Sequence, residues 1–207
     1  TLTVGVARRL GDSVAIGISV GASRLEVSET RRLWAGFAGI SAVGDPKRDV
    51  ELSFTGADGF VPSAVAGILL APVDTPMELA ASVGWTARAE IDADIAATGT
   101  TGGPIVRLMD PHASLAVRQP VSVRAGARYV GDWFAVELGG DLWFARRSAR
   151  KASWSVDGVR IVDPSTVAVD LVGVPSRLSQ RTHGAIRGAL DLELIPGFLW
   201  ATSGYAY

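Results

Sequence analysis

The feature that most constrains the fold of this chain is an alternation of apolar and polar side chains along unusually long segments. From 77 to 91 the odd positions are all apolar, whereas most even positions are polar, charged or glycine. A two-residue period is typical of a β-strand with one apolar face and one polar face. The segment is far longer than the ~5 to 6 residues usual for strands of globular proteins.

The same alternation recurs along the chain. It is clear in four further segments, which are 14–23, 121–129, 134–144 and 186–194. In the last three of these, the charged residues stand on the face opposite the apolar stripe. The pattern predicts about eight long antiparallel strands.

Short and long connections alternate between the expected strands. The tight connections contain Gly, Pro or Asp, which supply turn dihedral angles, and lie at 9–13, 71–76, 130–132 and 195–197. Three long stretches separate them, at 29–49, 97–111 and roughly 151–180. Outer-membrane β-barrels have short turns at the periplasmic end and long loops at the extracellular end. We therefore expect the tight turns at one end of the strands and the long connections at the other.

The hydrophobic content must be buried somewhere. It reaches 48% of the chain, yet no stretch approaches the ~18 to 20 continuous apolar residues of a membrane helix. A closed barrel is the other way to satisfy every backbone N–H and C=O group within lipid. We therefore predict an all-β, antiparallel, transmembrane up-and-down β-barrel, with 1–207 as one barrel domain or a fragment of one and no separate soluble domain. A soluble sandwich gives the same alternation, but its strands are shorter.

Charge and composition argue against several classes of function. The net charge of -1 gives no electrostatic footprint for nucleic acid, and the absence of cysteine removes zinc-thiolate sites and cysteine nucleophiles. The G-x-S-x-G pattern at 17–21 lies inside an alternating strand, and only His112 and His183 are available as bases. We expect no catalysis, no metal and no cofactor.

Four segments resemble, in the same order, segments of the FadL family of outer-membrane channels for fatty acids and hydrocarbons. They are 1–32, a hairpin that runs into a charged stretch; 59–92, with Ala66-Gly67-Ile68-Leu69 at the core of a hairpin; 115–144, with the break Gln119-Pro120 and an Asp-x-Trp; and 183–207, a later hairpin. The resemblance implies the central part of a 14-stranded barrel whose N-terminal segment plugs the lumen. No plug and no signal peptide are recognisable here, so we expect a processed chain, a fragment or a shortened relative.

The resemblance also implies a function. It is the passive uptake of hydrophobic small molecules, such as long-chain fatty acids or aromatic hydrocarbons, through the bacterial outer membrane of a Gram-negative cell. The expected partners are the substrate, outer-membrane lipid and lipopolysaccharide, and we expect a monomer that binds no nucleic acid. The alternative is a structural or adhesive barrel without transport.

The alternation separates two sets of side chains. The set predicted to face lipid comprises Leu79, Val83, Val123, Val136, Leu138, Leu190 and Leu192. The charges predicted to face the lumen are Arg88, Glu90, Arg124, Arg128, Glu137, Asp141, Arg187, Asp191 and Glu193. Arginines suit a carboxylate-bearing ligand because their fork donates two parallel hydrogen bonds. The alternative is that these charges pair with one another across neighbouring strands.

Aromatic residues and one apolar loop segment complete the candidate sites. Aromatic residues at strand ends are typical of an interfacial girdle, and they are Tyr129, Trp133, Phe134 and Phe198 beside tight turns and Phe144 and Trp154 toward long loops. The segment 33–40 is apolar within an otherwise polar loop. We expect its Leu33, Trp34, Phe37 and Ile40 either to collect an apolar ligand at the mouth or to pack on the barrel rim.

Overall fold

The structure is a computed structural model that describes residues 1–34, 49–99, 103–145, 151–162, 168–178, 180–195 and 197–207. Every regular element among them is a strand, which confirms the predicted all-β class. The strands are β1 (Leu2–Leu10), β2 (Val14–Trp34), β3 (Asp49–Leu70), β4 (Met77–Thr86), β5 (Arg88–Gly99), β6 (Ile105–Arg118), β7 (Val121–Val130), β8 (Phe134–Phe144), β9 (Ser153–Val162), β10 (Ala168–Asp170), β11 (Gly173–Pro175), β12 (His183–Ile195) and β13 (Leu199–Ala206). In this part of the chain no helix is long and apolar enough to cross a membrane.

Several of these strands follow one another along the same path through the sheet. Both β4 and β5 pair with β3 on one side. On the other side, β4 pairs with β7 and β5 pairs with β6. In the same way β8 leads into β9, and β10 and β11 lead into β12. The 13 strands among the described residues therefore fall into eight consecutive antiparallel passes through the sheet, which agrees with the number predicted from the alternation.

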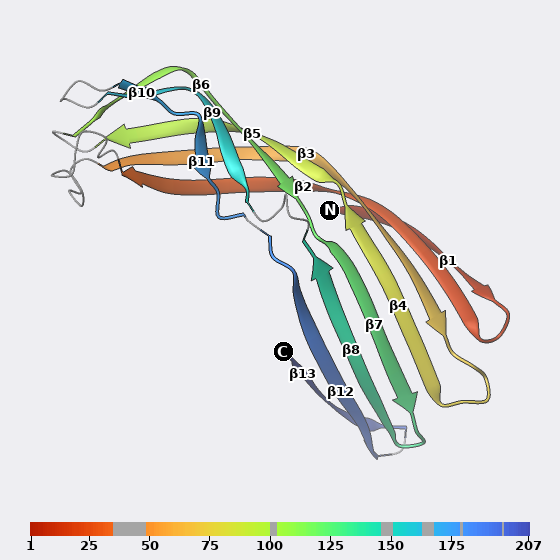
Figure 1. The fold of residues 1–207 in the computed structure, drawn as a ribbon. Helices are drawn as coiled ribbons and strands as arrows, with labels where there is room; N and C mark the ends of the chain where they lie inside the picture. The colour runs from red at the N-terminus through yellow and green to blue at the C-terminus, as the bar shows by residue number, and fades with distance from the viewer. Residues whose placement is uncertain (35–48, 100–102, 146–150, 163–167, 179, 196) are drawn as a thin grey trace.

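The tight turns lie together at one end of the strands (Figure 1). At that end Val14 pairs with Leu70, whereas Trp34 and Asp49 pair at the opposite end of the same ladder. Gly11 and Gly197 have φ angles of 73° and 70°, which glycine adopts without steric cost. The predicted placement of turns and connections at opposite ends is confirmed.

The bounds predicted for the long connections are wrong, because much of each stretch is strand. The strand β2 extends to Trp34, β6 begins at Ile105, and β9 to β11 occupy much of 151–175. In the last stretch polar and charged residues alternate with buried apolar ones, as exposed Asp157 does with buried Val156. Such charges project from one face of a strand instead of marking a loop.

The half of the sheet next to the tight turns is here named the belt. It consists of β1, β4, β7, β8, β12 and β13 with 14–23 of β2 and 61–70 of β3. One belt face exposes apolar side chains, including Leu79, Val83 and Leu138, while the opposite face carries ion-paired charges. The belt is an open sheet in the described residues, since β1 and β13 each have a strand on one edge only.

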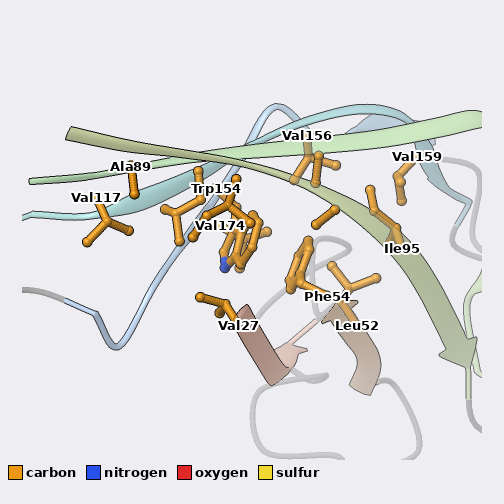
Figure 2. Packing of buried hydrophobic residues seen from close by; sticks show 14 of the residues in the cluster. Val27, Leu52, Phe54, Ala89, Ile95, Val117, Trp154, Val156, Val159 and Val174 are labelled. Carbon is orange, nitrogen blue, oxygen red and sulfur yellow. The ribbon is translucent and has the colours of Figure 1, made fainter. Parts of the chain in front are cut away.

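The other half rolls into a compact part with its own apolar core, here named the dome. It consists of β5, β6, β9, β10 and β11 with 24–34 of β2 and 49–57 of β3. Figure 2 shows its core, in which Phe54 of β3 stacks on Trp154 of β9 with ring centroids 4.8 Å apart. Both side chains are fully buried, and Val27, Val156 and Val174 belong to the same cluster.

A junction at 58–60, 87 and 119–120 joins the belt to the dome. There the carboxylate of Asp58 accepts backbone hydrogen bonds from Phe60 and Glu90 at 2.9 and 2.8 Å. The strand face that is exposed in the belt is buried in the dome: Trp85 is 51% exposed, whereas Ile91 on the same face is fully buried. The sheet therefore curves toward its polar face in the belt and toward its apolar face in the dome.

Candidate functional site

A hollow of about 1060 Å³ lies on the concave, polar face of the belt. Residues of β1, β2, β3, β4, β7, β8, β12 and β13 all line it, so the belt curves around it. Small side chains form most of its wall, among them Gly17, Gly67, Ala80, Gly126 and Gly139. The small inward residues of the alternation therefore leave room for a ligand on this face.

Two arginines share one buried carboxylate in the wall of this hollow. Arg187 donates a hydrogen bond to Asp141 Oδ2, and Arg124 Nε lies 3.4 Å from Asp141 Oδ1. The side chain of Asp141 is only 6% exposed, whereas those of Arg124 and Arg187 are 59% and 55% exposed. Since one carboxylate balances one of the two guanidinium groups, this cluster has an excess positive charge that faces open space.

A second, looser group lies nearer the tight turns. Arg128 lies 4.0 Å from a carboxylate oxygen of Glu78 and 3.7 Å from one of Asp191. Glu137 stands directly opposite Arg128 in the ladder, but no ion pair of Glu137 is found within the described ranges. Of the predicted lumen-facing charges, the structure thus brings Arg124, Asp141 and Arg187 together at one level and Arg128 and Asp191 at another.

Arg88 and Glu90 do not join these groups. Both lie on β5 in the dome, where they pair with each other at 3.3 Å and are exposed to solvent. They stand on the same strand face as the charges of the belt, but that face is the outer surface of the rolled dome. Arg88 and Glu90 therefore do not lie on the lumen side that was predicted for them, because the curvature of the sheet reverses at the junction. Glu193, by contrast, lies in β12 and accepts a hydrogen bond from the turn residue Gly197.

The predicted loop patch falls partly in a strand. Leu33 and Trp34 are the last residues of β2, where they pair with Val50 and Asp49. The side chain of Leu33 is partly buried and packs against the core of the dome. Phe37 and Ile40 lie outside the described residues.

An aromatic pair adjoins the arginine cluster and did not enter the predicted site. Trp143 and His183 are direct partners across β8 and β12, and their rings stack with centroids 4.7 Å apart at an angle of 12°. Trp143 follows Asp141 by two residues, so it stands on the same face of the strand. Its place in the alternation of β8 was the signal that could have identified it.

Aromatic residues border the exposed apolar face of the belt at both ends. Tyr129, Trp133, Phe134 and Phe198 gather near the tight turns, as predicted, and Tyr129 and Trp133 both pack against Phe134. Near the junction, Phe60, Trp85 and Phe144 are exposed at the other end of the belt. The expectation that Trp154 belongs to this border is wrong, because Trp154 is fully buried in the dome.

The residues considered for catalysis lie apart from one another. Ser19 pairs with Gly5 and Val65 in a regular ladder, not on the strand-to-helix turn of a nucleophile elbow. His112 lies in the dome, 3.7 Å from Asp92, and His183 stacks on Trp143. In the part of the chain that the structure describes, no group of His, Cys, Asp and Glu residues has metal-binding geometry.

A buried carboxylate in the dome was not anticipated from the sequence. Glu29, on β2, accepts hydrogen bonds from Trp154 Nε1, Ser176 Oγ and the backbone N–H of Arg177. Burial acts to raise the pKa of Glu29, but these hydrogen bonds and the nearby Arg31 outweigh it and hold the pKa below its ordinary value of 4.5. In the sequence Glu29 is one of several charges in what resembles a loop, so no local pattern distinguishes it.

Comparison with known proteins supports the fold. No protein-family model and no curated protein matches the chain. Among solved structures, the CymD monoaromatic hydrocarbon channel matches with a TM-score of 0.65 and 14% sequence identity. The match covers 98% of this chain and 58% of that channel, so this chain spans little more than half the length of its structural neighbour. The likeness supports the predicted fold, an antiparallel up-and-down sheet similar to that of a β-barrel channel.

Proposed function

We propose that this chain forms part of the wall of a bacterial outer-membrane channel for the passive uptake of hydrophobic small molecules. Long-chain fatty acids and aromatic hydrocarbons are the substrates proposed. The observation that carries the proposal is the hollow of about 1060 Å³ on the polar face of the belt, behind an exposed apolar face. A barrel whose interior is filled by its own side chains has no such space.

The outer face of the belt supports a position in a membrane. Its apolar side chains are exposed, and aromatic residues border them near the turns and near the junction. The strands β4, β7 and β8 have 10, 10 and 11 residues, which matches the ~9 to 11 residues of a tilted strand that crosses a bilayer. In this arrangement the tight turns are periplasmic and the dome is extracellular.

The arginine cluster favours a substrate that carries a carboxylate. Arg124 and Arg187 share Asp141 and still direct guanidinium groups into the hollow. A carboxylate-bearing ligand gains a charge-assisted hydrogen bond there, whereas a hydrocarbon gains nothing from it. The structural neighbour is a monoaromatic hydrocarbon channel, and this is consistent with an apolar substrate.

The rival proposal is a structural barrel without transport. The ion pairs of Arg124, Asp141 and Arg187 favour it, since charges that pair across strands stabilise a polar interior by themselves. The two proposals differ in what the hollow must do. Transport requires the hollow to be open, and a structural barrel does not.

The test fills the hollow with a side chain from the wall. Gly139 and Gly140 both lie in the wall of the hollow. Consecutive strand residues point to opposite faces, so a side chain at 139 projects into the hollow, whereas one at 140 projects from the apolar face beside Leu142 and Ile186. A Cβ at either position meets only ordinary contacts, with nearest atoms at 3.6 and 3.7 Å. We expect Gly139→Phe in the full-length protein to reduce uptake of radiolabelled toluene and oleate by at least about tenfold, because its ring occupies the ligand space.

Gly140→Phe is the matched control, because it adds the same ring on the other face and should leave uptake unchanged. Equal uptake by both folded variants would refute transport through this hollow. A further comparison decides between the substrates: Arg124→Gln should weaken binding of oleate but not of toluene, because only oleate carries a carboxylate.

A further inference from the structure

The dome is closed along one line without a hydrogen-bonded ladder. Its sheet runs in the order β2, β3, β5, β6, β9, with β10 and β11 on the far side of β9. Within the described residues, 24–34 of β2 pair only with β3, and β11 pairs only with β9. These two free edges, 24–34 and 173–178, meet where the sheet rolls onto itself, and this line is here named the seam.

A single carboxylate bridges the seam. Glu29 of β2 accepts hydrogen bonds from Ser176 Oγ at 2.7 Å and from the N–H of Arg177 at 2.8 Å. No backbone hydrogen bond crosses the seam in the part of the chain that is described. In hydrogen bonds, the seam depends on the carboxylate of Glu29 alone, whereas every other line of the roll is held by a ladder. To open it, the apolar cluster that includes Val27 and Val174 must also separate.

The same carboxylate holds an aromatic side chain of the core. Trp154 Nε1 donates to Glu29 Oε2 at 3.0 Å, and the indole stacks on Phe54 with an angle of 8° between the rings. In Figure 2, Trp154 and Val174 belong to one layer of the dome and lie above Phe54 and Val27, which belong to the other layer. Release of Glu29 thus removes the hydrogen bonds that tie 176–177 to β2 and, at the same time, the hydrogen-bond acceptor of Trp154 Nε1.

We propose that the seam is a gate for apolar ligands. It opens between β2 and 173–178 while the belt stays folded, and opening uncovers Phe54 and Trp154 as an apolar surface at the extracellular side of the channel. The aromatic pair suits an apolar ligand with a planar ring. The gate rests on the proposed function for its role in uptake, but its opening is a property of the dome alone.

The first test locks the seam reversibly in the full-length protein. The chain has no cysteine, so Glu29→Cys/Ser176→Cys introduces a unique thiol pair across the seam. A short bifunctional methanethiosulfonate links the pair, and a reducing agent releases the link. We expect the link to lower toluene uptake by at least about tenfold, and reduction to restore it, because the closed state is then the only one populated.

The matched control links two residues on neighbouring strands that a ladder already holds together. Thr30 and Ser53 are direct partners across β2 and β3, with side-chain oxygens 3.2 Å apart. The link in Thr30→Cys/Ser53→Cys should leave toluene uptake unchanged. If the linked seam pair transports toluene as fast as its reduced form, the gate is refuted.

A second test does not depend on transport or on replacing Glu29. Val174, on the edge strand of the seam, and Ala113, on the central strand β6, are 1% and 0% exposed. We expect the thiol of Val174→Cys to react with a water-soluble maleimide at least about tenfold faster than that of Ala113→Cys, because local opening at the seam exposes it. Equal rates overturn the gate. If Val174→Cys reacts but the wild type carries no toluene, the proposed function fails and the opening of the seam stands.

Discussion

Leu138 and Glu137 are neighbours on β8, yet their side chains belong to opposite faces of the belt. Leu138 is 62% exposed on the apolar face, whereas Glu137 lines the hollow. In water an exposed leucine at this position costs free energy, and in lipid it is solvated. The side chains on each face therefore decide which solvent, lipid or water, that face of the belt requires.

We expect Leu138→Arg to impair folding into lipid vesicles much more than Glu137→Arg. An arginine on the lipid face near the midplane costs ~2 to 4 kcal/mol, whereas the polar face already carries arginines. The measurement is the fraction of each full-length variant that becomes resistant to protease in vesicles. Equal folded fractions would contradict the assignment of the faces.

The long strands are the elements that join the belt to the dome, and they do so without changing the phase of their alternation. On the strand formed by β4 and β5 the odd residues are apolar from Met77 to Ile95. They are exposed in β4 and mostly buried in β5. Beside the junction, β3 and β5 approach closely at Gly56, where glycine leaves room that a side chain would fill.

We expect Gly56→Ala to destabilise the dome by ~1 to 3 kcal/mol, the usual cost of overpacking. A Cβ at Gly56 would lie 2.2 Å from the carbonyl oxygen of Asp92 and 2.8 Å from Ala93 Cα, so β3 and β5 must separate. The measurement is the midpoint of urea unfolding followed by near-ultraviolet circular dichroism.

Gly17→Ala is the control for this change, because Gly17 lies in the belt and a Cβ there meets its nearest atom at 3.6 Å. Its unfolding midpoint should match that of the wild type. An unchanged midpoint for Gly56→Ala would show that the two dome strands are less closely packed than the structure indicates.

The whole molecule combines two parts that are stabilised in different ways. The dome buries its apolar face in its own core, while the belt exposes its apolar face. The dome core depends on Glu29 remaining charged, because the ionised carboxylate accepts three hydrogen bonds. Since the pKa of Glu29 is lowered in the folded state, this stabilisation is present above the unfolded pKa and is lost as the pH falls through the folded pKa.

We therefore expect the dome to lose packing as the pH falls below 4.5, the ordinary pKa of a glutamate side chain, before the belt loses its strands. The measurement is the fluorescence of Trp154, in a variant whose other five tryptophans are replaced by phenylalanine, against far-ultraviolet circular dichroism of the strands. Glu29→Gln should lower dome stability at pH 7 and remove the part of the acid transition that belongs to this group. A wild-type acid transition identical to that of Glu29→Gln would contradict the role assigned to the carboxylate.

The sequence by itself determined the strands of the belt, the number of long strands, the tight turns and the two faces of the belt, but not the strands of the dome. These features are local: the two-residue period follows from strand geometry, and the turn positions follow from residues such as Gly11 and Gly197. Its resemblance to FadL-type channels also agreed with the fold found by comparison. The positions of Leu79, Val123 and Leu138 could be read from the alternation alone.

The tertiary structure alone decided which way the sheet curves, because alternation marks two faces without showing which is concave. The same face is exposed at Trp85 and buried at Ile91, so Arg88 and Glu90 lie outside a dome and not inside a lumen. The contact of Glu29 with Trp154 and Ser176 joins residues more than a hundred positions apart. Such contacts arise only when the sheet rolls onto itself, and a pattern with a two-residue period carries no information about them.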